Sequence, residues 1–179
     1  MEQKLFEINH ERFEVRMETA LECLDIEMCN KACESCSNFG KSWACPPFRE
    51  YDFPGLHPER FENLIIFVST LHFRQRILIE DARKIFNKEL YIFMPQLRQE
   101  AQKLAGIVYG FACSCDLCRS ACTRTFNKPC RHANLIGPSL EAAGFNVSKL
   151  LSRFCGNDLK WSQNGYAPRE MRYVSAIAY

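Results

Sequence analysis

The stretch "NLIIFVSTLHF", residues 63–73, is the clearest indication of the fold in the sequence. Its residues are mostly β-branched, aromatic or otherwise apolar, which are the types that pack best on a pleated sheet. A short run of this composition predicts a strand. We assign the rest of the chain outward from this strand.

Three further segments have the character of strands. "RFEVRM" (12–17) alternates apolar and charged residues, and "GIVYGFACS" (106–114) and "MRYVSAIAY" (171–179) are largely apolar. Strands that flank a long helical segment predict an α/β or α+β fold. We expect a small mixed sheet of three to four strands with flanking helices and two cysteine-rich metal-binding loops at one edge. The length predicts a single metal-binding domain over residues 1–179.

The helical segments are identified by their periodicity and their end signals. Residues 77–106 have a helical pattern, within which Pro95 is expected to begin a second helix. "PSLEAAG" (138–144) predicts a short helix, and Ser148 is expected to cap a helix over 149–155.

Composition and charge limit the class of protein. The chain of 179 residues is 47% hydrophobic and 25% charged, with a formal net charge of +2. This balance gives no support to a nucleic-acid or membrane partner, and the beginning of the chain lacks the apolar core of a signal peptide. The uncharged stretch 104–115 is shorter than the roughly 20 residues of a membrane span. We therefore expect a soluble, cytoplasmic protein; its oligomeric state stays open.

Cysteine is the unusual component, with 11 residues in the chain. In a reducing compartment, clustered thiols indicate metal ligands or redox groups rather than a disulfide framework. Eight of them form two sets, each with three close thiols and a fourth after a short loop. The first set is Cys29, Cys33, Cys36 and Cys45, and the second set is Cys115, Cys118, Cys122 and Cys130. This spacing lets neighbouring ligands converge on one centre, so it predicts metal binding.

The three-plus-one spacing favours iron and sulfur over zinc. Ferredoxins often place the last cysteine before proline, as Cys45-Pro46 does and Cys130-Arg131 does not. We expect two [4Fe-4S] clusters in an electron-transfer or redox component that serves a partner protein or a small molecule. Structural zinc usually takes two separated cysteine pairs, and a zinc-binding module stays as the alternative. A further alternative is a small enzyme whose open cluster iron acts as a Lewis acid, so enzymatic activity is undecided.

Other interpretations of the cysteines receive less support. The first three thiols resemble the motif of radical S-adenosylmethionine enzymes, but the chain is short for their barrel. The C-x-x-C pairs that begin at Cys33 and Cys115 match dithiol oxidoreductases, whose motif normally stands alone. Cys45 and Cys130 could exchange between the two centres. Cys23, Cys113 and Cys155 are expected to be buried apolar groups, with Cys113 as a substitute ligand.

Four residues beside the thiols are candidate cofactor-binding residues: Lys41, Arg131, His132 and Glu141. A four-thiolate cube carries a charge of about −2, which the three basic residues would offset. His132 could instead be a ligand or a proton donor, and Glu141 a general acid or base or merely a charge in the first turn of a helix. Trp43 and Phe48 flank Cys45 and are expected to shield a cluster from water.

The segments "MCNKACESCSNFGKSWACPP" (28–47) and "CDLCRSACTRTFNKPCRHANLIGPSLEAAGFNV" (115–147) resemble the two signatures of an uncharacterised prokaryotic family of predicted cysteine-rich metal-binding proteins. Its members share a C-x3-C…YGK…CPP segment and a C-x2-C…C…PCRHP…PSxEAxGxDV segment. The resemblance implies metal-binding roles for Cys29, Cys33, Cys45, Cys115, Cys118, Cys122 and Cys130. It also draws attention to Gly40, Lys41, Pro46, Pro47, Arg131, His132, Ser139 and Glu141.

The chain departs from this family pattern at several positions. Phe39, Ala133 and Asn146 replace the usual tyrosine, proline and aspartate. The pattern is variable at Cys36, so the ligand role of that residue depends on spacing alone. The resemblance implies a metal and no particular reaction.

Overall fold

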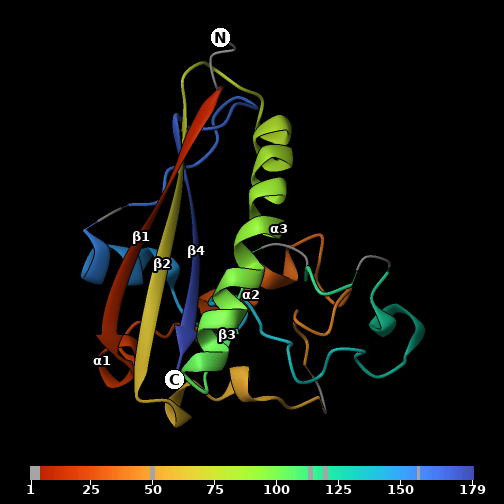
Figure 1. Ribbon diagram of the computed structural model, residues 1–179. Coiled ribbons are helices and arrows are strands. Elements are labelled where there is room, and N and C mark those ends of the chain that lie inside the picture. Colours follow the sequence, from red (N-terminus) through yellow and green to blue (C-terminus); the bar gives the residue numbers. More distant parts are fainter. Residues whose placement is uncertain (1–4, 49–50, 113–114, 119–120, 157) are drawn as a thin grey trace.

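Four strands form one sheet in the order β1-β2-β4-β3, and every strand pairing is antiparallel (Figure 1). The strands are β1 (Phe6–Arg16), β2 (Asn63–Phe73), β3 (Ile107–Tyr109) and β4 (Glu170–Ala178). This computed structural model describes residues 5–48, 51–112, 115–118, 121–156 and 158–179. The expected fold class and strand number are confirmed, although the only parallel contact in these ranges is an isolated bridge between Gly110 and Ser139.

The central strand β2 is buried on both faces. Successive side chains of a strand point to opposite sides. Ile65, Phe67 and Leu71 therefore enter one apolar cluster, while Leu64 and Ile66 enter a second cluster on the other face. This double burial explains why residues 63–73 form a nearly unbroken apolar run, and it confirms the predicted strand.

The other strands differ from prediction mainly in length. β4 lies within one residue of the expected range, whereas β1 begins at Phe6, well before the expected 12–17. β3 covers only Ile107–Tyr109 of the expected 106–114, because the chain leaves the sheet after Gly110. Just beyond β3, Gly110 pairs with Ser139 of a segment that returns to the sheet.

One helix, α3 (Ile79–Lys103), covers one face of the sheet (Figure 1). Its buried stripe is Ala82, Phe86, Leu90, Met94, Leu97 and Ala101. Pro95 lies inside this helix, so the expectation of a second helix beginning there is wrong. The apolar stripe continues past Pro95, and its burial outweighs the hydrogen bond that proline cannot donate to Tyr91. No helix in the described ranges has the length and apolar character needed to span a membrane.

Short helices cover the opposite face and the loops. They are α1 (Met17–Leu21), α2 (Ile26–Glu34), η1 (Pro54–Leu56), η2 (Pro58–Arg60), η3 (Thr123–Phe126), α4 (Val147–Leu150) and the π-helical turn η4 (Leu151–Cys155). The expected helix at 138–144 is wrong: residues 140–144 form turns that end at Gly144, whose φ is +94°. The next helix is capped by Asn146, which accepts from the Lys149 amide at 3.0 Å, rather than by Ser148.

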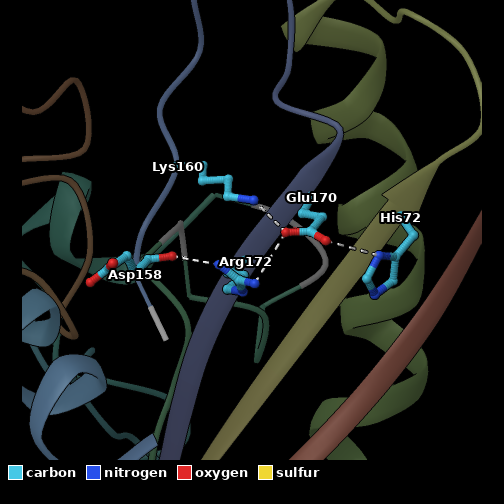
Figure 2. A network of polar contacts seen from close by, with 5 residues as sticks. All are labelled: His72, Asp158, Lys160, Glu170 and Arg172. Atoms are coloured by element: carbon cyan, nitrogen blue, oxygen red, sulfur yellow. Dashed lines mark hydrogen bonds and ion pairs between the residues drawn. The ribbon is translucent and has the colours of Figure 1, made fainter. Parts of the chain in front are cut away.

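A polar network lies where β4 begins, at the end of the sheet away from β3 (Figure 2). Glu170 contacts Lys160 at 2.5 Å, Arg172 at 3.2 Å and His72 at 3.9 Å. Arg172 also donates to the backbone carbonyl of Asp158 at 2.6 Å, which ties the preceding segment to the strand. Such partly exposed pairs contribute at most about 1 kcal/mol each.

The segment that follows the second set returns to the sheet beside β3. The Gly110 amide donates to the Pro138 carbonyl at 2.9 Å, next to the bridge with Ser139. Gly137 approaches the strand so closely that a Cβ would lie 1.8 Å from the Val108 carbonyl oxygen. Only glycine permits this approach, which places the loop against the sheet.

Gly137→Ala should therefore destabilise the protein by about 2–4 kcal/mol, because the loop or β3 must shift. Gly110→Ala is the matched control, since its Cβ would meet nothing closer than Met94 Cε at 3.8 Å. We expect the control to change the free energy of unfolding by less than about 1 kcal/mol in urea denaturation. Equal stability of the two variants would contradict the close approach.

Candidate metal centre

The first two thiols of the first set lie on α2. Cys29 and Cys33 are four residues apart, which places them on the same face of the helix. Asp25 caps this helix by accepting from the Met28 amide at 3.2 Å. Cys29 is buried and donates to the Phe145 carbonyl at 3.3 Å. This helix was not predicted from the sequence, although the aspartate before two cysteines at i and i+4 is a signal for a helix start.

The other two thiols of the first set follow in turns, and both accept hydrogen bonds. The Asn38 amide donates to Cys36 Sγ at 3.5 Å, and the Ser42 hydroxyl donates to Cys45 Sγ at 3.2 Å. Cys36 is exposed and Cys45 is half-buried. Donors of this kind stabilise a thiolate and tune a metal that it binds.

Three thiols of the first set share a pocket with Glu141. Cys33, Cys36 and Cys45 line a cavity of about 180 Å³, together with Ser139 and Glu141. Burial raises the pKa of Glu141, while hydrogen bonds to its own backbone and to Ser139 act in the opposite direction. The structure thus brings this candidate residue to the first set, from a turn rather than from the expected helix.

The second set lies around η3 and against aromatic residues. Cys122 comes directly before η3, and Cys130 accepts from the His132 amide at 3.4 Å. The Tyr51 side chain is also hydrogen-bonded to Cys130, and burial followed by the charge of Cys130 raises the pKa of Tyr51. Cys115 and Cys130 pack against the small apolar cluster of Ala44, Phe53 and Ile136, and Trp43 and Phe48 pack against the same cluster.

The two sets lie next to each other, and Cys45 interacts with members of both. Burial raises the pKa of Cys45, the Ser42 hydrogen bond lowers it, and the charges of Cys36 and Cys122 raise it further. In the described ranges, however, no three His, Cys, Asp or Glu side chains converge closely enough to hold a metal ion. The ten described cysteines are all free thiols. The arrangement gathers soft donors in one region of the surface without closing them around a point.

The remaining candidates occupy different surroundings. Lys41 is exposed in the turns between Cys36 and Cys45. Arg131 donates to the Ala121 carbonyl at 2.7 Å, within its own loop, and His132 is half-buried. As expected, Cys23 and Cys155 are buried in the hydrophobic core. Cys113 lies outside the described residues.

Sequence reasoning missed Tyr51 and Arg124. Arg124 lies in η3 and donates to backbone carbonyls on both sides of Cys45. The sequence shows that Arg124 lies between Cys122 and Cys130. It does not show which backbone carbonyls accept from Arg124, because every residue type has a backbone carbonyl. Tyr51 lies in a proline-rich segment that predicted only irregular structure.

A comparison with models of protein families identifies a metal-binding family. The family model described as "Predicted metal-binding protein (DUF2284)" matches residues 22–178, a range that includes both sets. No curated protein and no solved structure matches the chain.

The thiol pKa values predict a loss of stability in alkali for the metal-free protein. Burial, followed by the charges of Glu141 and neighbouring groups, raises the pKa of Cys29 from 9.0 to about 11. Below pH 9 this thiol is protonated in both states, and its contribution is fully present. Between pH 9 and 11 the unfolded chain loses the proton first, so folding stability falls as the pH rises.

Cys29→Ala removes this titration. Between pH 9 and 11, the unfolding free energy of the reduced, metal-free wild type should therefore fall steadily relative to that of the variant. Urea denaturation at several pH values measures it. A difference that stays constant over this range would contradict the assignment of a buried Cys29 thiol.

Proposed function

Because the chain belongs to the DUF2284 family of predicted metal-binding proteins, we propose that it is an iron–sulfur protein with two four-thiolate [4Fe-4S] clusters. Cys29, Cys33, Cys36 and Cys45 would hold one cluster, and Cys115, Cys118, Cys122 and Cys130 the other. The observation that carries the proposal is the gathering of two thiol sets, distant in sequence, on adjacent loops. A donor set made of thiols suits iron–sulfur clusters or zinc better than harder metals.

The surroundings of the thiols fit a bound cation. Burial raises the pKa values of Cys33 and Cys115 to about 11, so these thiols are costly to ionise while no cation is near. A metal offsets that cost and displaces the protons, which couples metal binding to proton release. The donors to Cys36, Cys45 and Cys130 then become hydrogen bonds to ligating sulfur.

Several features favour iron–sulfur over structural zinc. Each set has three close thiols and one remote thiol, and Cys45 is followed by Pro46 and Pro47. Aromatic residues lie beside the loops, and a shielded, hydrogen-bonded environment sets the potential of such clusters. When bound, the clusters supply one-electron transfer. The chain's own loops would position them, and the exposed Cys36 lies where a redox partner protein or a small molecule has access.

A second candidate function is supported by the pocket that Cys33, Cys36 and Cys45 share with Glu141. If Cys36 is not a ligand, one iron of the first centre is open, and Glu141 is available to hold or donate a proton to a bound small molecule. Cys36 is the suitable residue to test, since it is exposed and its ligand role depends on spacing alone.

Anaerobically purified protein should be brown and contain about eight irons and eight sulfides per chain. Cys118→Ala should reduce both to about four, because one centre loses a ligand. Cys155→Ala is the control, since this core cysteine belongs to neither set and should leave the iron content unchanged. Colourless protein with stoichiometric zinc would refute the iron–sulfur proposal in favour of the zinc-binding module.

Cys36→Ala separates electron transfer from the second candidate. Loss of about four irons, equal to the loss in Cys33→Ala, is expected if both cysteines are ligands. Full retention in Cys36→Ala, with loss in Cys33→Ala, would instead identify an open iron. Iron and sulfide assays, with the spectrum of the reduced protein, measure both variants.

A further inference from the structure

We propose that Arg124 is a positioning residue that fixes Cys45 of the first set to the loop of the second set, so that the two centres bind metal cooperatively. The inference rests on the proposed function only in that both sets bind a metal centre, whichever metal that is. It assigns a role to a side chain outside both cysteine sets and outside the candidate cofactor-binding residues.

One guanidinium group holds the backbone on both sides of Cys45. Arg124 Nη1 donates to the Ser42 carbonyl at 2.7 Å and to the Cys45 carbonyl at 2.5 Å, and Nη2 donates to the Pro47 carbonyl at 2.5 Å. The fixed, planar fork of arginine makes such a set of bonds possible from a single side chain. The last thiol of the first set is therefore positioned by a residue that lies between two thiols of the second set.

A second contact runs in the opposite direction. Trp43 Nε1, from the first loop, donates to the Lys128 carbonyl of the second loop at 3.0 Å. The Arg124 guanidinium lies 5.3 Å from the Trp43 ring, within the range of a cation–π contact. The Trp43 ring is also 4.6 Å from that of Tyr51, which is hydrogen-bonded to Cys130. The two loops are thus interlocked by contacts from each side.

The segment around Cys45 lacks regular secondary structure, so its backbone carbonyls need hydrogen-bond donors from elsewhere in the chain. Residues 41–48 form turns and bends without a helix or strand. Pro46 and Pro47 have no amide hydrogen to donate, so this stretch cannot pair with a neighbouring strand in the usual way. Its carbonyl groups still require donors where they are buried. Arg124, which is charged at all physiological pH values, provides them.

Cooperative metal binding follows from this linkage. A metal bound to the second set would order the loop that carries Arg124, and the hydrogen bonds would transmit that order to Cys45. The coupling must be reciprocal, because binding at either centre changes the affinity of the other by the same factor. Chains with one filled centre should therefore be scarce at partial loading.

Native mass spectrometry of protein reconstituted anaerobically with ferrous iron and sulfide, at half of the saturating amount, tests the coupling. Wild type should contain mostly empty and doubly filled chains, whereas Arg124→Gln should approach statistical loading, with about half of its chains singly filled. Lys128→Gln is the matched control: it removes a positive charge from the same loop, keeps the carbonyl that accepts from Trp43, and should behave as wild type. A wild-type distribution in Arg124→Gln, or statistical loading of the wild type, would overturn the inference.

Repeating the titration with Zn²⁺ separates this inference from the proposed function. Cooperative loading with zinc but no uptake of iron and sulfide refutes the iron–sulfur proposal and supports the coupling of the two centres through Arg124. Independent loading with both metals refutes only the coupling through Arg124. No uptake of either metal at either set refutes both.

Hydrogen exchange of the metal-free protein provides a readout that does not depend on metal. In Arg124→Gln, the amides of Gly40, Lys41 and Cys45 should exchange about tenfold faster, while those of β2 stay protected. Arg124→Lys keeps the charge and loses the fork, so it should resemble the glutamine variant in both exchange and loading. Wild-type behaviour of Arg124→Lys, or unchanged exchange in Arg124→Gln, would show that the guanidinium contacts do not position Cys45.

Discussion

The hydrogen bond from the Gly110 amide to the Pro138 carbonyl determines where the second cysteine loop returns to the sheet. β3 ends at Tyr109, and this bond and the close approach of Gly137 to Val108 hold the returning segment against the end of the strand. Ser139 and Glu141 follow at once, so both are delivered to the pocket of the first set. Two loops far apart in sequence therefore meet because one backbone segment docks beside a short strand.

The electrostatic balance of the thiols suits a protein that is stable before it binds metal. Burial raises the pKa values of Cys29, Cys33 and Cys115 further above neutral pH, so these thiols of the metal-free loops carry no negative charge there. Four-thiolate clusters would each bring a charge of about −2 to a chain of net charge +2. Arg124 is well placed to offset part of that charge, because its charge already lowers the pKa of Cys45.

Elements that depend on the local sequence could be predicted, whereas those that depend on long-range packing could not. β2 was predicted correctly because burial on both faces favours apolar residues at most positions, and that is visible in one sequence. The helix through Pro95 was not, because the packing of residues such as Met94 and Leu97 overrides a local breaker. The cysteine spacing predicts which thiols share a centre, and that grouping stays a prediction. It could not indicate that Glu141 faces the first set, since that depends on the long-range docking of the second loop.

The position of Cys45 also bears on whether the centres are independent. A thiol that interacts with Cys36 of its own set and Cys122 of the other lies at the boundary between them. The spacing alone leaves open whether Cys45 and Cys130 exchange between the centres. Cys45 would lie at this boundary in either case. Under either assignment, Arg124 of the second loop donates to the backbone on both sides of Cys45, so under the proposed coupling a change at one centre would reach the other through these hydrogen bonds.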